Sequence, residues 1–356
     1  MFIVNVDWFF DSHRRPLEKR LSKDYHTSIV AGDSGYATEY SMEKFSVSAR
    51  VPTIKGIKQL YLTVRKFSKD TIFVVVSPVM IIVCHFLFRK RSFIIYNFSG
   101  LGFLRSKSRL IRGLILQSFL NYPVKGTRVI VVQNKDDFNY FDELARDKDH
   151  IHTEIIAGSG FEKKQVHQDS LDISRLVIGY VGRVRKDKGI LDLVRAVTDL
   201  QNAGYSINLK IWGNLDDSTR HGFSESELEE LKSQSHYFQG FSKDKREIFS
   251  SFNWFCLPSN GEGLSKAAIE ASSFGLPLLL SNVQGNRDMI KDNGFLFEYG
   301  DVENLKRVLV DISNLSKEEV QNMSETSKSM FEVNWTLESV YNKWKQLLVK
   351  YDTFSA

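Results

Sequence analysis

Cysteine, proline and, over one long stretch, acidic side chains are scarce in this chain of 356 residues. The two cysteines, Cys84 and Cys256, lie in apolar segments of different halves. A structural disulfide is therefore not expected, and a reducing compartment is the default. With six prolines and 42% apolar residues, the composition excludes a disordered chain and suits a packed globular protein. The length is comfortable for two domains.

The shortage of acids lies between residues 44 and 128, where Asp70 is the single acidic side chain against 16 Lys and Arg. Such a basic surface attracts anionic lipid, glycan or nucleic acid. In residues 54–66 and 105–116 the cations are interleaved with apolar residues, which favours helices lying on an anionic membrane. Ordinary domain helices with solvated basic faces are the alternative. Aromatic-and-basic signatures of nucleic-acid recognition are absent, which disfavours that partner.

The sequence also lacks a convincing membrane-spanning run. Residues 71–88 are nearly uncharged and about the minimum length to cross a bilayer. However, Pro78 lies in the middle of this segment and β-branched residues dominate its first part. A buried strand at 72–77 and a helix at 79–88 account for it better. The first residues, 1–6, are expected to form a core strand and not a signal peptide.

Short apolar runs alternate with helical patterns along the whole chain, which is typical of βαβ units and parallel sheets. The polar stretch 162–174 is the natural linker between two α/β domains, 1–168 and 169–335. Two such sheets facing each other would form one cleft, because ligand sites lie beyond the carboxyl ends of parallel strands. Strands are expected near residues 2–6, 27–31, 72–77, 93–98, 128–133, 176–181, 206–212, 237–239, 253–257 and 277–281.

One motif of the C-terminal half predicts an anion site. The apolar strand 176–181 runs into Gly182 and Arg183, and Lys188 follows just before a helix expected from about Ile190. A glycine turn, two cations and a helix N-terminus together suit a diphosphate. Basic loops after strands are usually solvated surface, so this motif is weak by itself.

A second motif, residues 259–271, makes the prediction more specific. It places Glu262 and Glu270 across the junction of a glycine-bearing loop and an Ala-rich helix that Ser265 is expected to cap. The glycines let the backbone approach a ligand, and the unpaired amides of the helix face it. Glu270 is placed to accept two hydrogen bonds from vicinal hydroxyls, as on a ribose.

Together these motifs resemble glycosyltransferase family 4, the retaining nucleotide-sugar transferases of GT-B fold. Residues 7–14, 100–102 and 158–160 look like bacterial enzymes that add N-acetylhexosamines to polyprenyl-diphosphate-linked glycans. The resemblance implies two Rossmann-like domains, with residues 336–356 forming a helix that crosses back to the first. The matching segments are Gly182-Arg183, Lys188-Gly189, Pro258-Ser259, Glu262-Gly263, Glu270-Ala271, Gly275-Leu-Pro277, Gly285-Asn-Arg-Asp288 and Asn293-Gly294.

The resemblance implies a role for each donor-site residue. Glu270 is expected to bind the ribose, Arg183 and Lys188 the diphosphate, and Glu262 to position the sugar or to support its loop. Lys266 is expected to contact phosphate or to pair with Glu270. The expected donor site is Gly182, Arg183, Lys188, Glu262, Gly263, Leu264, Ser265, Lys266 and Glu270, with Asn286 and Arg287 as further candidates at its border. The catalytic assignments are Glu262, Arg183, Lys188 and His13.

The N-terminal domain is expected to bind the acceptor. His13 and Arg14 follow the first strand, where this branch keeps Ser-His-Arg, and Arg14 is predicted to contact an acceptor phosphate. Many relatives carry a His or Glu just before the glycines that follow a later strand, whereas this chain has Ser99. Either Asn97, Ser99 or a backbone carbonyl substitutes, or His13 takes that role. The acceptor-side residues are Arg14, Asn97, Ser99 and Gly100, and His85 is expected to belong to the core.

The resemblance implies retaining transfer of an N-acetylhexosamine from a UDP-sugar to a lipid-linked glycan of O-antigen, capsule or protein glycan assembly. No Asp-rich metal motif accompanies the two loops, so no metal or other cofactor is expected to be required. Alternatives are another donor such as GDP-mannose, and a nucleotide-sugar-binding protein without turnover. The protein is expected to be cytoplasmic, bound peripherally to the inner face of the cytoplasmic membrane.

Overall fold

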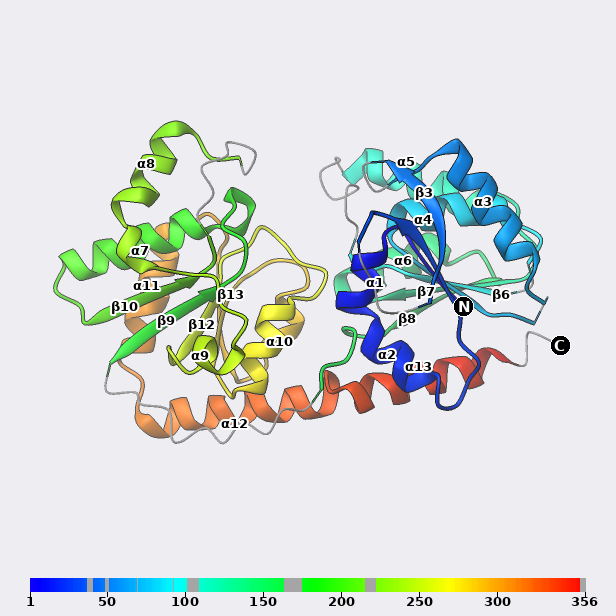
Figure 1. Ribbon diagram of the computed structural model, residues 1–356. Helices are drawn as coiled ribbons and strands as arrows, with labels where there is room; N and C mark the ends of the chain where they lie inside the picture. Colours follow the sequence, from blue (N-terminus) through cyan, green and yellow to red (C-terminus); the bar gives the residue numbers. More distant parts are fainter. Residues whose placement is uncertain are drawn as a thin grey trace. The chain divides into compact units, whose positions relative to one another are not determined.

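The computed structural model describes residues 1–36, 41–48, 51–68, 70–91, 93–100, 109–162, 175–214 and 222–352. The chain forms two compact units (Figure 1). Unit 1 contains Met1–Glu162 and Trp335–Ala356, and unit 2 contains Lys163–Asn334. The chain therefore passes between the units twice. The expected boundary at 168/169, and the linker beyond Glu162, lie outside the described residues.

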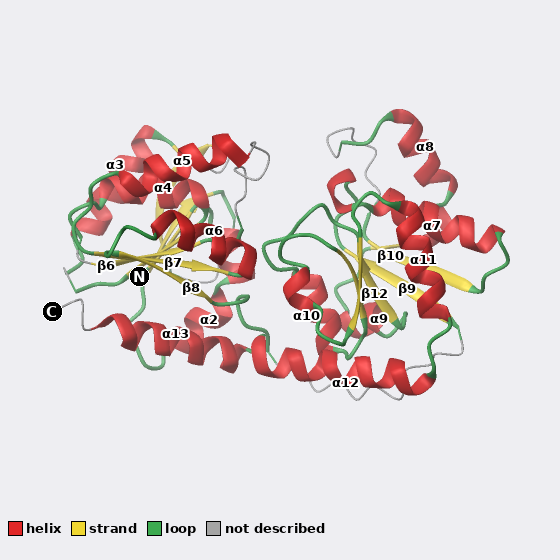
Figure 2. Ribbon diagram, turned by 180° about the vertical axis from the view of Figure 1, so that it is seen from behind, coloured by secondary structure: helices red, strands yellow, loops and turns green. Residues whose placement is uncertain are grey.

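Unit 1 contains an eight-stranded sheet in the order β4-β3-β2-β1-β5-β6-β7-β8, parallel except for the β3–β4 pair. Its middle strands are buried because helices cover both faces of the sheet (Figure 2). The strands are β1 (Phe2–Val4), β2 (Ile29–Asp33), β3 (Glu43–Ser48), β4 (Val51–Pro52), β5 (Phe73–Val76), β6 (Phe93–Asn97), β7 (Thr127–Val132) and β8 (Ile151–Ile155).

Two clusters of core residues fill the two faces of this sheet. Helices α3, α4, α5 and α6 pack on one face, and α1, α2 and α13 pack on the other. The helices are α1 (Asp7–His13), α2 (Arg15–Leu21), α3 (Ile54–Arg65), α4 (Pro78–Leu87), α5 (Arg109–Asn121), α6 (Lys135–Ala145) and α13 (Leu337–Asp352).

The apolar segment 71–88 forms strand β5 followed by helix α4, which Pro78 begins. Within the described ranges, none of the helices combines the length and the hydrophobicity needed to cross a membrane. The final helix α13 contributes Val340, Tyr341 and Trp344 to the core of unit 1. Residues 105–108 of the predicted basic segment 105–116 fall outside the described residues, and the side chains of residues 109, 110 and 112 are not described.

Unit 2 contains a six-stranded parallel sheet in the order β11-β10-β9-β12-β13-β14. Its strands are β9 (Leu176–Val181), β10 (Ile207–Trp212), β11 (Phe238–Gly240), β12 (Trp254–Leu257), β13 (Leu278–Ser281) and β14 (Gly294–Phe297). Its helices are α7 (Ile190–Asn202), α8 (Glu225–Ser233), α9 (Lys245–Phe249), α10 (Lys266–Ser273), α11 (Val302–Ser313) and α12 (Lys317–Asn334), with 3-10 turns at Lys186–Lys188, Ser235–Tyr237 and Arg287–Met289.

Each sheet has one point where the order of its strands reverses. In unit 1 this point lies between β1 and β5, and in unit 2 between β9 and β12. Ligands of open parallel sheets bind beyond the carboxyl ends of the strands at such points. The structure thus confirms an α/β fold with two parallel-sheet domains, and its topology directs attention to the loops after these four strands.

Candidate functional site

The first loop of unit 2 leaves β9 at Gly182, whose amide donates to Trp212 O at 3.0 Å. The loop ends at Gly189, which has a φ of +65°. A Cβ at that position would lie 1.9 Å from Pro258 O, so only glycine lets this loop press against the one that follows β12. The Asn260 amide also donates to Asp187 O at 2.9 Å. The two predicted motifs are therefore in direct contact.

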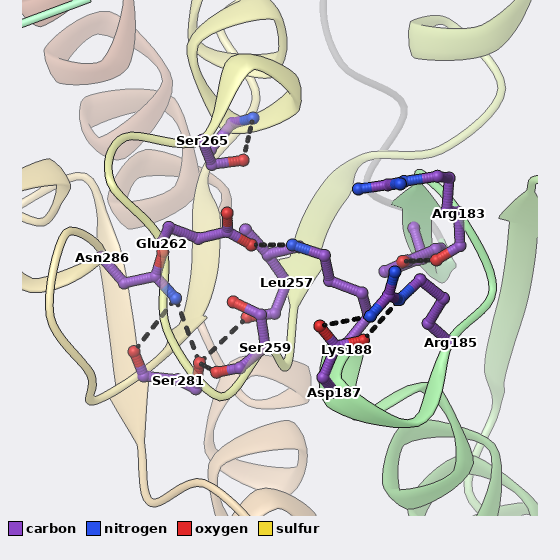
Figure 3. A network of polar contacts seen from close by, with 12 residues as sticks. Arg183, Arg185, Asp187, Lys188, Leu257, Ser259, Glu262, Ser265, Ser281 and Asn286 are labelled. Carbon is purple, nitrogen blue, oxygen red and sulfur yellow. Dashed lines mark hydrogen bonds and ion pairs between the residues drawn. The ribbon is translucent and has the colours of Figure 1, made fainter. Parts of the chain in front are cut away.

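The second loop is held from beneath by buried hydrogen bonds (Figure 3). Ser281 Oγ donates to Ser259 O at 2.5 Å, and the Asn286 amide donates to Ser281 Oγ at 3.0 Å. Asn286 is fully buried. A Cβ at Gly285 would come within 2.4 Å of Glu262 O. Asn286, a candidate at the border of the donor, thus supports the loop, and Arg287 Nε donates to Asn282 Oδ1 at 2.8 Å.

Lys188 of the first loop and Glu262 of the second meet as an ion pair. Lys188 Nζ lies 2.5 Å from Glu262 Oε1, and the two side chains are only 20% and 16% exposed. Arg183 is exposed, and Figure 3 shows its guanidinium extended over the same side of the loops. Three of the four residues predicted to be catalytic therefore gather at one edge of the sheet of unit 2.

Helix α10 begins as predicted. Ser265 Oγ accepts from the Ala268 amide at 3.2 Å, which confirms the cap, and the helix runs on from Lys266. Glu270 lies one turn further and accepts from Lys245 Nζ at 3.0 Å. Lys245 belongs to α9, and sequence reasoning did not identify it.

A pocket of about 440 Å³ opens between the loops that follow β9, β10 and β11. Phe241 lies in its wall and is 73% exposed. Gly213 allows the β9 and β10 loops to approach, since a Cβ there would lie 2.1 Å from Gly182 O. Sequence reasoning missed this pocket. The lining residues are Val181, Gly182, Arg183, Val184, Trp212, Gly213, Asn214, Gly240, Phe241, Ser242, Lys245 and Ile248.

In unit 1 the structure brings three predicted acceptor-side residues together. Arg14 Nη2 donates to Ser99 Oγ at 2.7 Å and to Asn97 Oδ1 at 3.5 Å. Gly100 follows directly and is half-buried. His13 is hydrogen-bonded to Ser12 Oγ through Nδ1 at 2.6 Å and stacks on Phe9, with ring centroids 4.6 Å apart.

His85 lies in the core of unit 1, as expected. It is fully buried, and its Nδ1 lies 2.9 Å from Tyr96 Oη. Burial, together with the nearby charge of Arg128, lowers the pKa of His85 to about 4. Across the described ranges, no group of three or more His, Cys, Asp or Glu side chains is placed to hold a metal ion.

Comparison with known proteins assigns the part of the chain that contains the two loops. Residues 161–330 match the family model of glycosyl transferases group 1. The matched segment includes every strand of unit 2 from β9 to β14, and therefore both loops, the Lys188–Glu262 pair and the pocket. Unit 2 is thus a glycosyl transferases group 1 domain.

Curated relatives agree with this domain assignment. The capsular polysaccharide biosynthesis glycosyltransferase CapM of Staphylococcus aureus is 29% identical over 206 residues, which is 52% of each chain. The UDP-Gal:alpha-D-GlcNAc-diphosphoundecaprenol alpha-1,3-galactosyltransferase of Escherichia coli is 36% identical over 77 residues, 21% of this chain and 20% of that enzyme. The chain spans about half the length of CapM and less of the galactosyltransferase.

A solved structure extends the likeness to the fold of the whole chain. The structure of Anabaena HepE in complex with UDP and glucose aligns with a TM-score of 0.72 and 13% identity, covering 98% of each chain. This confirms the GT-B architecture of two parallel-sheet domains.

Proposed function

We propose that this protein is a glycosyltransferase that moves a sugar, an N-acetylhexosamine, from a UDP-sugar to a lipid-linked glycan during assembly of a surface polysaccharide. The observation that carries the proposal is the Lys188–Glu262 ion pair between the two loops, together with the pocket of unit 2 that Arg183 lines. The names of CapM and of the galactosyltransferase support the polysaccharide context and the diphosphoundecaprenol-linked acceptor, and the HepE complex supports UDP.

The pocket and the two loops provide a place for each part of the donor. The base enters the pocket, where Phe241 offers a ring for stacking. Glu270 is paired with Lys245, which lines the pocket, and binds the ribose hydroxyls. Arg183, Lys188 and the first amides of α10 bind the diphosphate, because cations and helix N-termini favour anions. Gly182, Gly263, Leu264, Ser265 and Lys266 border the phosphates and the sugar.

The chemistry requires that charge developing on the leaving diphosphate be stabilised. Arg183 and Lys188 supply two positive charges at that position, and these charges stabilise the leaving diphosphate as the glycosidic bond breaks. When Lys188 binds phosphate, it leaves Glu262, and the freed carboxylate positions the sugar. These two cations supply positive charge that a divalent cation would otherwise supply, so transfer proceeds without a required metal. Retention follows if the leaving oxygen accepts the proton of the acceptor hydroxyl on the same face.

A lipid-linked acceptor requires access to a membrane surface, and helix α3 suits this role. Its exposed residues include Lys55, Lys58 and Arg65, interleaved with Leu62 and with Ile54, which is 90% exposed. Leu60 and Val64 face the core of unit 1. We infer that α3 holds unit 1 on the anionic inner face of the cytoplasmic membrane.

The test is thermal stabilisation of the protein by UDP and GDP, and by their sugars, with and without EDTA. A ligand at 100 times its Kd stabilises the folded state by roughly 2.7 kcal/mol. We expect a UDP-dependent shift that survives EDTA, followed by transfer of the best-binding sugar to a prenyl-diphosphate-linked acceptor. Stabilisation by GDP alone would overturn the choice of nucleotide, and stabilisation by no nucleotide would overturn the transferase.

A further inference from the structure

The side chain of Arg14 is a buried cation that forms no ion pair with any described residue. It lies at the junction of α1 and α2 and is 1% exposed. Its hydrogen-bond partners, Ser99 Oγ and Asn97 Oδ1, are both neutral. Among the described residues no carboxylate forms an ion pair with it. A charge held in this way is costly unless a bound group compensates it.

Two buried donor atoms at this position, one of them in the guanidinium itself, have no acceptor among the described residues. Arg14 Nε and Asn97 Nδ2 are both buried and have no hydrogen-bond partner in the described part of the chain. Guanidinium and amide nitrogens only donate, so the missing groups are acceptors. Burial lowers the pKa of Arg14 to about 10, which leaves it charged at neutral pH.

The position of this group in the sheet is that of a ligand site. Asn97 ends β6, and its register partner Val76 ends β5. Ser77 is the residue after Val76; it has a φ of +81° that residues other than glycine rarely adopt, and its buried Oγ has no partner among described residues. Helix α4 begins at the next residue, and its first amides lack intrahelical partners. β5 also borders the reversal point of the sheet of unit 1.

A second buried arginine of unit 1 shows the contrast. Arg128 is fully buried as well, but its guanidinium donates to the carbonyl oxygens of Thr127, Arg91 and Phe88 at 3.0, 3.1 and 3.4 Å. These contacts connect the amino end of β7 to the chain after α4. Arg128 Nε also has no partner among the described residues, but the guanidinium has three carbonyl acceptors, whereas that of Arg14 has one hydroxyl and one long contact to an amide.

We propose that Arg14, Asn97, Ser99 and Ser77, together with the N-terminus of α4, form a phosphate-binding site in unit 1. It takes the phosphate or diphosphate group of the prenyl-linked acceptor. The anion site rests on the geometry of unit 1, whereas the identity of the acceptor rests on the function proposed above.

The test uses the full chain carrying Arg183→Ala and Lys188→Gln, which removes the two cations of the donor loop. Inorganic pyrophosphate and farnesyl diphosphate are each titrated into this variant by isothermal calorimetry. We expect about one equivalent to bind, and Arg14→Gln to weaken binding at least tenfold. Arg128→Gln is the matched control: it lowers the thermal midpoint and leaves pyrophosphate affinity unchanged.

Asn97→Asp gives a sharper test that does not depend on removing a core side chain. It places a carboxylate next to the Arg14 guanidinium, so an internal counter-ion takes the place of the bound anion. We expect a higher thermal midpoint together with loss of pyrophosphate binding. Unchanged pyrophosphate binding in both Asn97→Asp and Ser99→Ala would overturn the site, as would no binding to the Arg183→Ala, Lys188→Gln variant.

The two ligands separate the possible sources of the phosphate. Tighter binding of farnesyl diphosphate than of pyrophosphate supports a lipid-linked acceptor, and equal binding overturns that assignment while the anion site stands. UDP titration of the unmodified protein is carried out in parallel. If the unmodified protein does not bind UDP but Arg14→Gln still weakens pyrophosphate binding, the result contradicts the transferase and not the anion site. If UDP binds and Arg14→Gln leaves pyrophosphate binding unchanged, the result contradicts only the anion site.

Discussion

At the scale of single residues, Glu270 is the predicted ribose-binding residue, and an ion pair already holds its side chain. Its carboxylate is paired with Lys245 and mostly buried. We expect Glu270→Ala to weaken UDP binding about tenfold, or roughly 1.4 kcal/mol, because two ribose hydroxyls lose their acceptor. Glu230→Ala, which removes an exposed ion pair with Arg195 in the same unit, is the control. Equal UDP affinities for all three proteins would remove Glu270 from the site.

His85 makes the stability of unit 1 depend on pH. Burial lowers its pKa to about 4 from a usual value of 6.5, so the unfolded chain binds the proton more readily. The stabilisation is present above pH 6.5 and is lost as pH falls towards 4, by about 1.4 kcal/mol per pKa unit. Thermal midpoints between pH 7 and pH 5 should therefore fall less steeply in His85→Gln. The exposed His236→Gln should follow the unmodified protein, and identical slopes for all three would contradict the assignment.

At the scale of elements, the contact between the β9 and β12 loops depends on one glycine. A methyl group at Gly189 meets Pro258 O and also forces a φ of +65° on alanine. We expect Gly189→Ala to lower stability by roughly 1–3 kcal/mol and to abolish UDP binding, since Lys188 is displaced. Gly204→Ala adds strain at a φ of +91° where nothing lies within 4 Å. It should lower the thermal midpoint alone, so loss of UDP binding in both variants would refute the contact argument.

Helix α3 has a charged outer face that unit 1 does not need for packing. Changing Lys55, Lys58 and Arg65 to Ser should reduce binding to phosphatidylglycerol vesicles by about 1 kcal/mol for each charge removed. The matched control is the same number of substitutions at the exposed cations Lys232, Lys243 and Arg246 of unit 2. Cosedimentation with vesicles measures both. Equal loss in the two triple variants would mean that net charge, and not α3, governs the binding.

At the scale of the whole molecule, each unit has its own core. Trp344 of α13 is buried in unit 1, and Trp254 of β12 is buried in unit 2. We expect Trp344→Ala to destabilise unit 1 by about 3–5 kcal/mol and to leave UDP affinity intact. Trp254→Ala should weaken both unit 2 and UDP binding. Calorimetric melting with and without UDP distinguishes them, and an equal loss of UDP affinity would contradict separate cores.

Part of this fold and of its candidate site could be predicted from the sequence. Buried strands such as β5 and β9 are continuous apolar runs and were predicted, as was the cap of α10 by Ser265. Strands β3, β4, β8 and β14 were missed. Strands β3 and β8 are partly exposed and lack such runs, and β4 and β14 are only two and four residues long. The Lys188–Glu262 and Lys245–Glu270 pairs join residues 74 and 25 positions apart, so only the packed loops reveal them. The roles assigned to the site residues stay predictions.

The course of the chain through unit 1 also bears on its synthesis. Unit 1 begins with the first strand and ends with α13, and all of unit 2 is translated between them. Val340, Tyr341 and Trp344 can fill their face of the first sheet only after unit 2 has left the ribosome. Unit 2, which is continuous in sequence, can therefore fold first. Until α13 is synthesised, unit 1 exposes the apolar sheet face that α13 covers. On the ribosome, the domain that is started first is completed last, and a chaperone would find its binding surface there.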